Sequence, residues 1–232
     1  MVGNFKSYLA ELIGTFALVF IGAGAVCLDA QTGGRTGLPG IALAYGLTIT
    51  AMTYTYRPIS GAHFNPAVTT AMFISRRIDA VQALFYIAAQ LCGAVLAALL
   101  LKTVLHNYPQ LLTGRPFLGA CIVSGIGFKA ATLLEAVGTF LMVSTIYATD
   151  VDKRGHAPTA PLAIGFSIAA VALAIAPLTG AALNPARAFG PAVVTGHWNN
   201  GFVYWAGPLV GALAACLLQE SLFLVKEKER RG

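Results

Sequence analysis

Charged side chains are scarce in this sequence. Lysine and arginine together number 15 and aspartate and glutamate 9, so that 10% of the 232 residues are charged, whereas a soluble domain carries about 25%. Hydrophobic residues make up 57% of the chain, and its mean hydropathy is +0.73. So few charges cannot cover the surface of a soluble protein, and we expect apolar surface that faces lipid. The same scarcity excludes a nucleic-acid-binding protein, because there is no basic stripe to follow phosphates.

Metal-binding and catalytic patterns are also missing. The four cysteines show neither a CxxC motif nor the spacing of metal ligands. We expect all four to be small buried apolar residues: Cys27, Cys92, Cys121 and Cys216. No nucleophile is accompanied by a base or a metal set. The sequence therefore predicts no metal site, no cofactor and no enzymatic activity.

Long runs without charge fill most of the chain. A helix that spans the hydrocarbon core needs about 20 mostly apolar residues, and glycine, proline and asparagine divide the longest runs. The sequence therefore predicts an all-α membrane protein with six spanning helices, at residues 8–27, 37–56, 80–103, 129–149, 158–177 and 201–224.

Two apolar segments remain, Pro58–Ser75 and Thr179–Val194. Each contains an Asn-Pro-Ala tripeptide and leaves only about ten helical residues after its proline, half of a membrane thickness. Irregular backbone at that depth is tolerated only where it is buried in protein or lines a watery cavity. Surface loops are the alternative, but both segments are apolar and contain good helix starts. We expect two re-entrant half-helices.

The chain contains an internal repeat. The segment 9–16 (LAELIGTF) recurs at 133–140 as LLEAVGTF, so that Glu135 lies 124 residues after Glu11. The second Asn-Pro-Ala begins at Asn184, 119 residues after the first at Asn65. Each half holds three spans, and because three is odd the halves have opposite orientations. The pattern predicts a 3+3 inverted repeat about an axis in the membrane plane.

Lysine and arginine are distributed unequally between the two sides that these spans define. With a cytoplasmic N-terminus, ten fall inside: Lys6, Arg57, Arg76, Arg77, Lys153, Arg154, Lys226, Lys228, Arg230 and Arg231. Four fall outside: Arg35, Lys102, Arg115 and Lys129. The excess predicts that both termini are cytoplasmic.

These motifs together resemble the aquaporin (major intrinsic protein) family. The resemblance rests on the two Asn-Pro-Ala motifs in inverted halves, the stretch Ser60–Phe64 before the first, and Arg187 after the second. It covers almost the whole chain and implies one channel domain at 1–232, with repeats at approximately 5–115 and 128–227. It also implies a homotetramer in the lipid bilayer, in the plasma (inner) membrane. The short termini are similar to those of bacterial members.

The tripeptides Asn65-Pro66-Ala67 and Asn184-Pro185-Ala186 have a direct physical meaning. Asparagine is a strong helix N-cap, and proline is favoured at the first helical position. Each motif therefore begins a half-helix, and the repeat brings the two positive N-terminal ends together near the midplane. The ends should repel cations, while the asparagine amides donate to a passing water. Simple capping is the alternative role, and the two roles are compatible.

Four further residues are candidates for the pore. Arg187 is the only Asp, Glu, Lys or Arg residue between residues 155 and 219, and an embedded charge indicates function unless it snorkels to the interface. The resemblance implies that Glu11 and Glu135 hold backbone N–H groups of the two re-entrant loops; an acid–base pair is a poor alternative. It also implies that His63 lines the cytoplasmic vestibule, with a structural histidine as the alternative.

Members of the aquaporin family carry the residues of their selectivity filter at fixed distances in sequence from the two motifs. The same distances in this chain imply a selectivity filter of Tyr45, Ala172, Ala181 and Arg187. Strict water channels usually have a histidine at the second of these positions, so the ring should be wider than usual. Ala188 and Ala192, which follow Arg187 in the sequence, are typical of water channels.

The sequence therefore predicts a passive water channel that excludes protons and ions. Through its wide filter it should also admit small neutral solutes such as glycerol, urea, ammonia or hydrogen peroxide. A glycerol or metalloid facilitator of the same fold is the alternative. A coupled transporter would need titratable groups beyond Glu11 and Glu135.

Overall fold

The computed structural model describes residues 2–224, with side chains from residue 5 onward. Within this range the chain is helical and contains no strand. Its long helices are α1 (Val2–Gln31), α2 (Gly37–Ser60), α4 (Ala80–Val104), α6 (Phe128–Ile146), α7 (Ala160–Thr179) and α9 (Val203–Leu218). The short ones are α3 (Pro66–Ile74), α5 (Gln110–Thr113) and α8 (Pro185–Thr195). A 3-10 turn covers Phe117–Gly119, and π-helical turns at Tyr147–Val151 and Gln219–Phe223 extend α6 and α9.

The six predicted spans correspond to the long helices. Among the described residues, five helices are long and apolar enough to cross a membrane, at Phe5–Gln31, Ala80–Val104, Phe128–Val151, Ala160–Thr179 and Val203–Phe223. The sixth, α2, has sufficient length, but its threonines and tyrosines lower its mean hydropathy. It packs against α1 and α7 and leaves Leu43, Leu47 and Tyr54 exposed. The predicted all-α membrane protein is confirmed.

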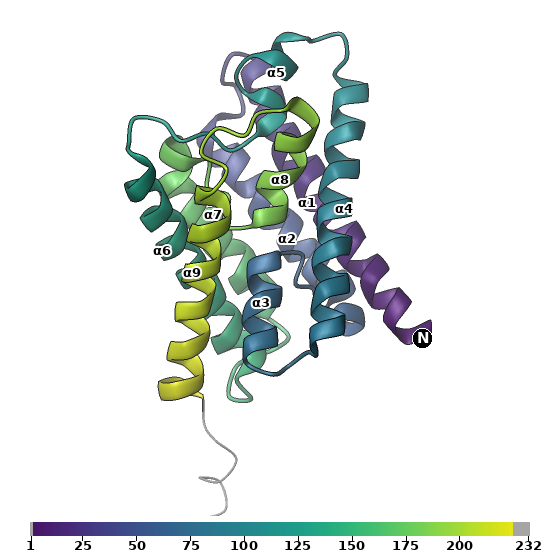
Figure 1. The fold of residues 1–232 in the computed structure, drawn as a ribbon, viewed down its shortest axis with the longest axis vertical. Coiled ribbons are helices and arrows are strands. Elements are labelled where there is room, and N and C mark those ends of the chain that lie inside the picture. Colours follow the sequence, from purple (N-terminus) through teal and green to yellow (C-terminus); the bar gives the residue numbers. More distant parts are fainter. Residues whose placement is uncertain (1, 225–232) are drawn as a thin grey trace, which may run out of the picture.

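The two halves exchange their half-helices. In each half the first and third long helices pack along one another, α1 with α4 and α6 with α9. The half-helix α3 packs mainly against α9, and α8 mainly against α4. In Figure 1, α3 runs from the middle of the molecule to the lower end and α8 runs to the upper end. The halves are therefore interlocked across the centre, as an inverted repeat requires.

Two glycines allow the helices of each half to approach closely. A Cβ atom on Gly93 of α4 would lie 2.2 Å from the carbonyl oxygen of Leu12 in α1. In the second half, a Cβ atom on Gly211 of α9 would lie 2.0 Å from the carbonyl oxygen of Ala136 in α6. Only a residue without a side chain fits either crossing. The contacted residues, Leu12 and Ala136, directly follow Glu11 and Glu135 in the sequence. The two close contacts therefore fix the positions of these glutamates in the bundle.

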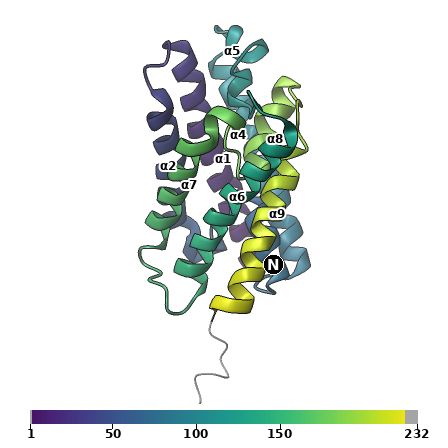
Figure 2. The ribbon, with the colours of Figure 1, turned by 90° about the vertical axis from the view of Figure 1, so that its left-hand side faces the viewer.

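The two described ends of the chain lie at the same end of the bundle (Figures 1 and 2), and which side of the membrane that end faces stays a prediction. In Figures 1 and 2, α1 begins and α9 ends at the same lower end of the molecule. The basic residues Lys226, Lys228, Arg230 and Arg231, which contributed to the predicted orientation, lie outside the described residues, as does the end of the repeat at 227. The helix α5 and the 3-10 turn lie at the opposite end, in a connection that the sequence did not predict to be structured.

Candidate functional site

The re-entrant segments before the two half-helices share one backbone conformation. Gly61 and Gly180 end α2 and α7 with φ values of 86° and 83°. In each segment the first and third residues after this glycine are also left-handed: Ala62 and Phe64 at 55° and 50°, and Ala181 and Leu183 at 45° and 53°. Such residues cost of order 1–3 kcal/mol each and cluster at functional sites. The surrounding structure must hold both segments in place.

Two buried glutamates hold these segments. Glu11 is 0% exposed, and its two carboxylate oxygens accept hydrogen bonds from the backbone N–H groups of His63, at 2.9 Å, and Phe64, at 2.6 Å. In the second half, Glu135 is also 0% exposed. It accepts from the N–H groups of Ala182, at 2.9 Å, and Leu183, at 2.7 Å. The structure thus places both acids in the role that the resemblance implies.

The two asparagines meet at the centre of the molecule. Asn65 Oδ1 accepts from the Ala67 N–H at 2.8 Å, and Asn184 Oδ1 accepts from the Ala186 N–H at 2.9 Å, so each caps its half-helix. Each amide Nδ2 donates one hydrogen bond across the repeat, Asn65 to the Leu183 carbonyl at 2.9 Å and Asn184 to the Phe64 carbonyl at 2.8 Å. An amide nitrogen has two donors, so one remains on each side for a molecule between them.

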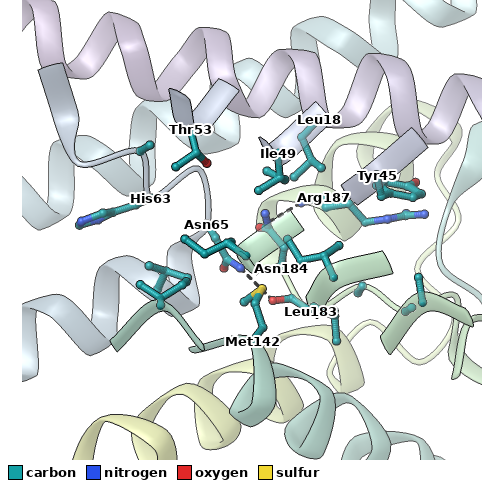
Figure 3. Close-up of a pocket in the computed structure, with 18 of the residues that line it drawn as sticks. Leu18, Tyr45, Ile49, Thr53, His63, Asn65, Met142, Leu183, Asn184 and Arg187 are labelled. Atoms are coloured by element: carbon teal, nitrogen blue, oxygen red, sulfur yellow. Dashed lines mark hydrogen bonds between the residues drawn. The ribbon is translucent and has the colours of Figure 1, made fainter. Parts of the chain in front are cut away.

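A cavity passes this pair of asparagines. Its wall includes His63, Asn65, Asn184 and Arg187, and Figure 3 shows them in that order, with Asn65 and Asn184 between His63 at one end and Arg187 with Tyr45 at the other. Apolar side chains form most of the remaining wall: Leu18, Ile49, Val68, Met72, Met142, Ile146, Ile164, Ile168 and Leu183. We call it the inner cavity. Its few polar groups are concentrated at the centre and the ends.

A second cavity continues on the other side of Arg187. This outer cavity is lined from Arg187 to Asp29 and Leu38 at the end of the bundle that carries α5. Four residues line both cavities: Tyr45, Ala172, Ala181 and Arg187. They are the four positions that the resemblance implies for the selectivity filter. The structure therefore brings them together where the two cavities meet.

Arg187 is fixed within this ring. Its side chain is buried, with 3% exposed, and Nη1 donates to the Gly119 carbonyl at 2.8 Å. The guanidinium carbon lies 4.9 Å from the centroid of the Tyr45 ring, which is a cation–π distance. The sequence did not identify Gly119, which comes from the connection between α4 and α6. Snorkelling to the interface is therefore wrong for this arginine.

His63 lies in the wall of the inner cavity and also takes part in a structural hydrogen-bond network. Its ring lines the inner cavity, and Nδ1 forms a 3.1 Å hydrogen bond with Thr69 Oγ1. Thr69 Oγ1 also accepts from Gln90 Nε2 at 2.9 Å, and this same amide nitrogen donates to Glu11 at 2.7 Å. The histidine is thus tied to the network that supports the first re-entrant segment.

An ion pair at the inner end of the cavity was not predicted. Asp150 lines the inner cavity and pairs with Arg57 in the last turn of α2. Asp150 lies in the π-helical turn Tyr147–Val151, which widens the end of α6. No periodicity signals such a turn in a sequence. Among the described residues, no group of three or more His, Cys, Asp and Glu side chains gathers as metal ligands would.

Comparisons with known proteins agree on one family. The family model for the major intrinsic protein family matches residues 1–219. The chain is 40% identical over 238 residues to probable aquaporin TIP3-2 of Arabidopsis thaliana, covering 97% of this chain and 86% of that protein. It is 43% identical over 227 residues to aquaporin TIP1-2 of Zea mays, covering 94% and 86%. Both relatives come from plants, so a bacterial origin stays a prediction.

Among solved structures, the chain is similar to the X-ray structure of the aquaglyceroporin from Plasmodium falciparum. The TM-score is 0.84 at 24% sequence identity, over 94% of this chain and 96% of the other. At this identity the likeness shows the fold alone.

Proposed function

Because the chain belongs to the major intrinsic protein family, we propose that the cavities described above form the pore of a passive channel for water and small neutral solutes. The protein is an integral multi-pass membrane protein and a channel, not an enzyme. The observation that carries the proposal is that an inner and an outer cavity share one four-residue ring, with both asparagines lining the inner cavity.

The paired asparagines support water passage with exclusion of protons. A water between them accepts from the free hydrogen of each Nδ2, so its own hydrogens point away along the pore. Two donors at one point interrupt the alternating hydrogen-bond chain that a proton needs for hopping. The positive N-terminal ends of α3 and α8, each about half a charge, oppose a cation at the same place.

Arg187 supports a second barrier. It is a permanent cation whose Nη1 is held by Gly119, while the rest of the guanidinium faces the ring. A passing solute with a hydroxyl or carbonyl finds donors there, whereas a cation meets a like charge at close range. Because the barrier is fixed in the wall, neutral molecules pass and ions do not.

The remaining ring residues support a wide filter. Ala172 and Ala181 each contribute one methyl group to the ring, and Tyr45 supplies the only aromatic side chain of the four. A molecule larger than water should enter such a ring. We propose that glycerol, urea, ammonia or hydrogen peroxide passes together with water. Glycerol or metalloid transport as the main activity remains the alternative.

Osmotic experiments on proteoliposomes test this proposal. Shrinkage under a sucrose gradient measures water permeability, and reswelling under glycerol or urea gradients measures solute entry. We expect fast shrinkage, and reswelling with at least one solute that Ala172→His reduces by adding bulk to the ring. A wild-type protein that conducts water but rejects the four solutes as firmly as Ala172→His would contradict the wide filter. Solute entry without fast water flow would favour the alternative.

We extend the proposal to assembly and location. The family resemblance implies a homotetramer with one pore in each subunit and a place in the plasma (inner) membrane, and the unequal distribution of lysine and arginine supports cytoplasmic termini. Native mass spectrometry in lipid discs should find four chains. A protease that cleaves the terminal segments only from the cytoplasmic side would support the orientation, and cleavage from the outside would overturn it.

A further inference from the structure

One glycine of α1 lies directly behind the aromatic residue of the filter. Gly22 is buried, and it is not among the residues that line the inner or the outer cavity. A Cβ atom on Gly22 would lie 2.0 Å from Cε1 of Tyr45, and 2.4 Å from both Cδ1 and Cζ of the same phenol ring. The phenol ring therefore occupies the space that any other residue at position 22 would fill with its side chain.

The same phenol ring borders the pore. Tyr45 lines both the inner and the outer cavity, and its ring centroid lies 4.9 Å from the guanidinium carbon of Arg187. Figure 3 shows these two side chains together at one end of the inner cavity. Tyr45 is otherwise packed in protein, with 7% of its surface exposed. The space open to a phenol ring displaced from α1 is therefore the pore itself.

Two other glycines with a similar contact belong to the backbone that the repeats share. A Cβ atom on Gly14 would lie 2.0 Å from Cε1 of Phe64, and a Cβ atom on Gly138 would lie 2.7 Å from Cδ2 of Leu183. The two glycines are equivalent in the repeat, and so are the two residues that they contact. These glycines therefore make room for the re-entrant segments, which both halves contain.

Gly22 has no such counterpart. The residue 124 positions later, in α6, is Ile146, and the residue equivalent to Tyr45, 119 positions later in α7, is Ile164. Both isoleucines line the inner cavity. A glycine behind an aromatic residue thus occurs at this place in the first half and not in the second. The pair belongs to the filter, which is also not repeated, rather than to the shared backbone.

We propose that Gly22 is a positioning residue that sets the solute size limit of the channel. The inference rests on the proposed function of the two cavities as a pore. Because position 22 has no side chain, the phenol ring of Tyr45 lies back against α1 and leaves the filter open to solutes of glycerol size. Carbon atoms in contact lie about 3.5–4.0 Å apart, so an alanine would force the phenol ring to move by about 1.5 Å or more, into the filter.

Solute flux in proteoliposomes tests this proposal against a matched change two residues away. In Gly22→Ala the ratio of glycerol to water permeability should fall by about tenfold, because the filter narrows. Gly24→Ala is the control on the same helix. A Cβ atom on Gly24 would lie 3.4 Å from its nearest neighbour, Cδ2 of Leu101, which is an ordinary contact. This variant should keep the wild-type ratio.

A double variant separates an action through Tyr45 from a general effect on helix packing. Tyr45→Ala removes the phenol ring, so adding Gly22→Ala to it should no longer change the permeability ratio. An equal fall in Gly24→Ala, or the same fall in the Tyr45→Ala background, would overturn the proposal. So would an unchanged or higher ratio in Gly22→Ala, or its failure to fold where Gly24→Ala folds, because the phenol ring would then not move into the filter.

The wild-type protein distinguishes this inference from the proposed function. Fast water flow with glycerol excluded would overturn the inference, since the filter would already be narrow with a glycine at position 22. A wild-type protein without fast water flow would instead contradict the proposed pore.

Discussion

The two re-entrant segments share a backbone but differ in side chains. Along the repeat, Val68 in the first turn of α3 occupies the place of Arg187 in α8, and both line the inner cavity. His63 corresponds in the same way to Ala182. The first segment is thus apolar where the second carries the fixed cation. The backbone of the two segments is therefore symmetric, and differences between equivalent side chains make the two ends of the pore different.

The supports of the two segments differ as well. Glu11 accepts from two backbone N–H groups, from Ser60 Oγ at 2.6 Å and from Gln90 Nε2 at 2.7 Å. Glu135 accepts hydrogen bonds from two backbone N–H groups and from the hydroxyl of Thr179, which is the residue equivalent to Ser60 in the second half. Gln90 in α4 therefore gives the first carboxylate an additional donor. The carboxylate of the first half therefore accepts from more donors, while the second half carries three of the four ring residues.

The largest expected effect comes from removing either carboxylate. Glu11→Leu and Glu135→Leu each leave two buried N–H groups without a partner, at about 1–3 kcal/mol for each group. We expect both variants to lose most of their folded protein in detergent, with the lower melting temperature for Glu11→Leu because more donors are orphaned. Fluorescence-detected size exclusion after heating measures this. Equal losses would show that Ser60 and Gln90 add nothing to the first anchor.

Making the second half-helix resemble the first should change function more than stability. Arg187→Val removes the fixed cation, and we expect proton permeability to rise by about tenfold or more while water flow persists. A pH-sensitive dye inside proteoliposomes measures the leak.

The reciprocal variant Val68→Arg is the control for this prediction. It places a second cation in the inner cavity without touching Arg187, and we expect it to slow water flow. If Arg187→Val leaves proton exclusion intact in a folded channel, the asparagine pair supplies the whole barrier.

The contribution of Gln90 can be measured by itself. Its amide is buried and donates to both Glu11 and Thr69, and hydrogen bonds to a charged group contribute about 1.5–3 kcal/mol. Gln90→Leu should therefore lower stability by about that amount, less than Glu11→Leu does. Gln82→Leu, at the start of the same helix, is the control and should have a smaller effect. A Gln90→Leu protein as stable as the Gln82→Leu protein would refute the additional anchor.

Much of this architecture could be predicted from local patterns. Apolar runs give the long helices, and an asparagine before a proline gives each half-helix, because capping acts within three residues. The partner of Arg187 could not be predicted, since Gly119 is 68 residues away in a connection without periodicity. Asp150 was missed because a π-helical turn sets its direction, and the expectation that all four cysteines are buried is wrong for Cys92, which is exposed on α4.

The smallest expected effect tests whether the two re-entrant segments share the same backbone conformation. Ala62 and Ala181 are equivalent residues with φ values of 55° and 45°, a conformation that costs an alanine about 1–2 kcal/mol and a glycine almost nothing. A glycine also increases the entropy of the unfolded chain, which offsets about 0.4–1 kcal/mol of that gain. Ala62→Gly and Ala181→Gly should therefore each raise stability slightly, and by similar amounts.

Their effects on flux should nevertheless differ. Ala181 lines the ring, so Ala181→Gly removes one of its two methyl groups and should increase glycerol entry, whereas Ala62 lines only the inner cavity and Ala62→Gly should leave glycerol entry unchanged. Melting temperatures and reswelling rates of the same two preparations provide both comparisons. Similar stability with different glycerol flux is what a symmetric frame with one functional ring requires. A rise in glycerol flux for Ala62→Gly would mean that the narrowest point of the pore lies deeper than the ring, because widening the inner segment helps only if that segment limits the flow.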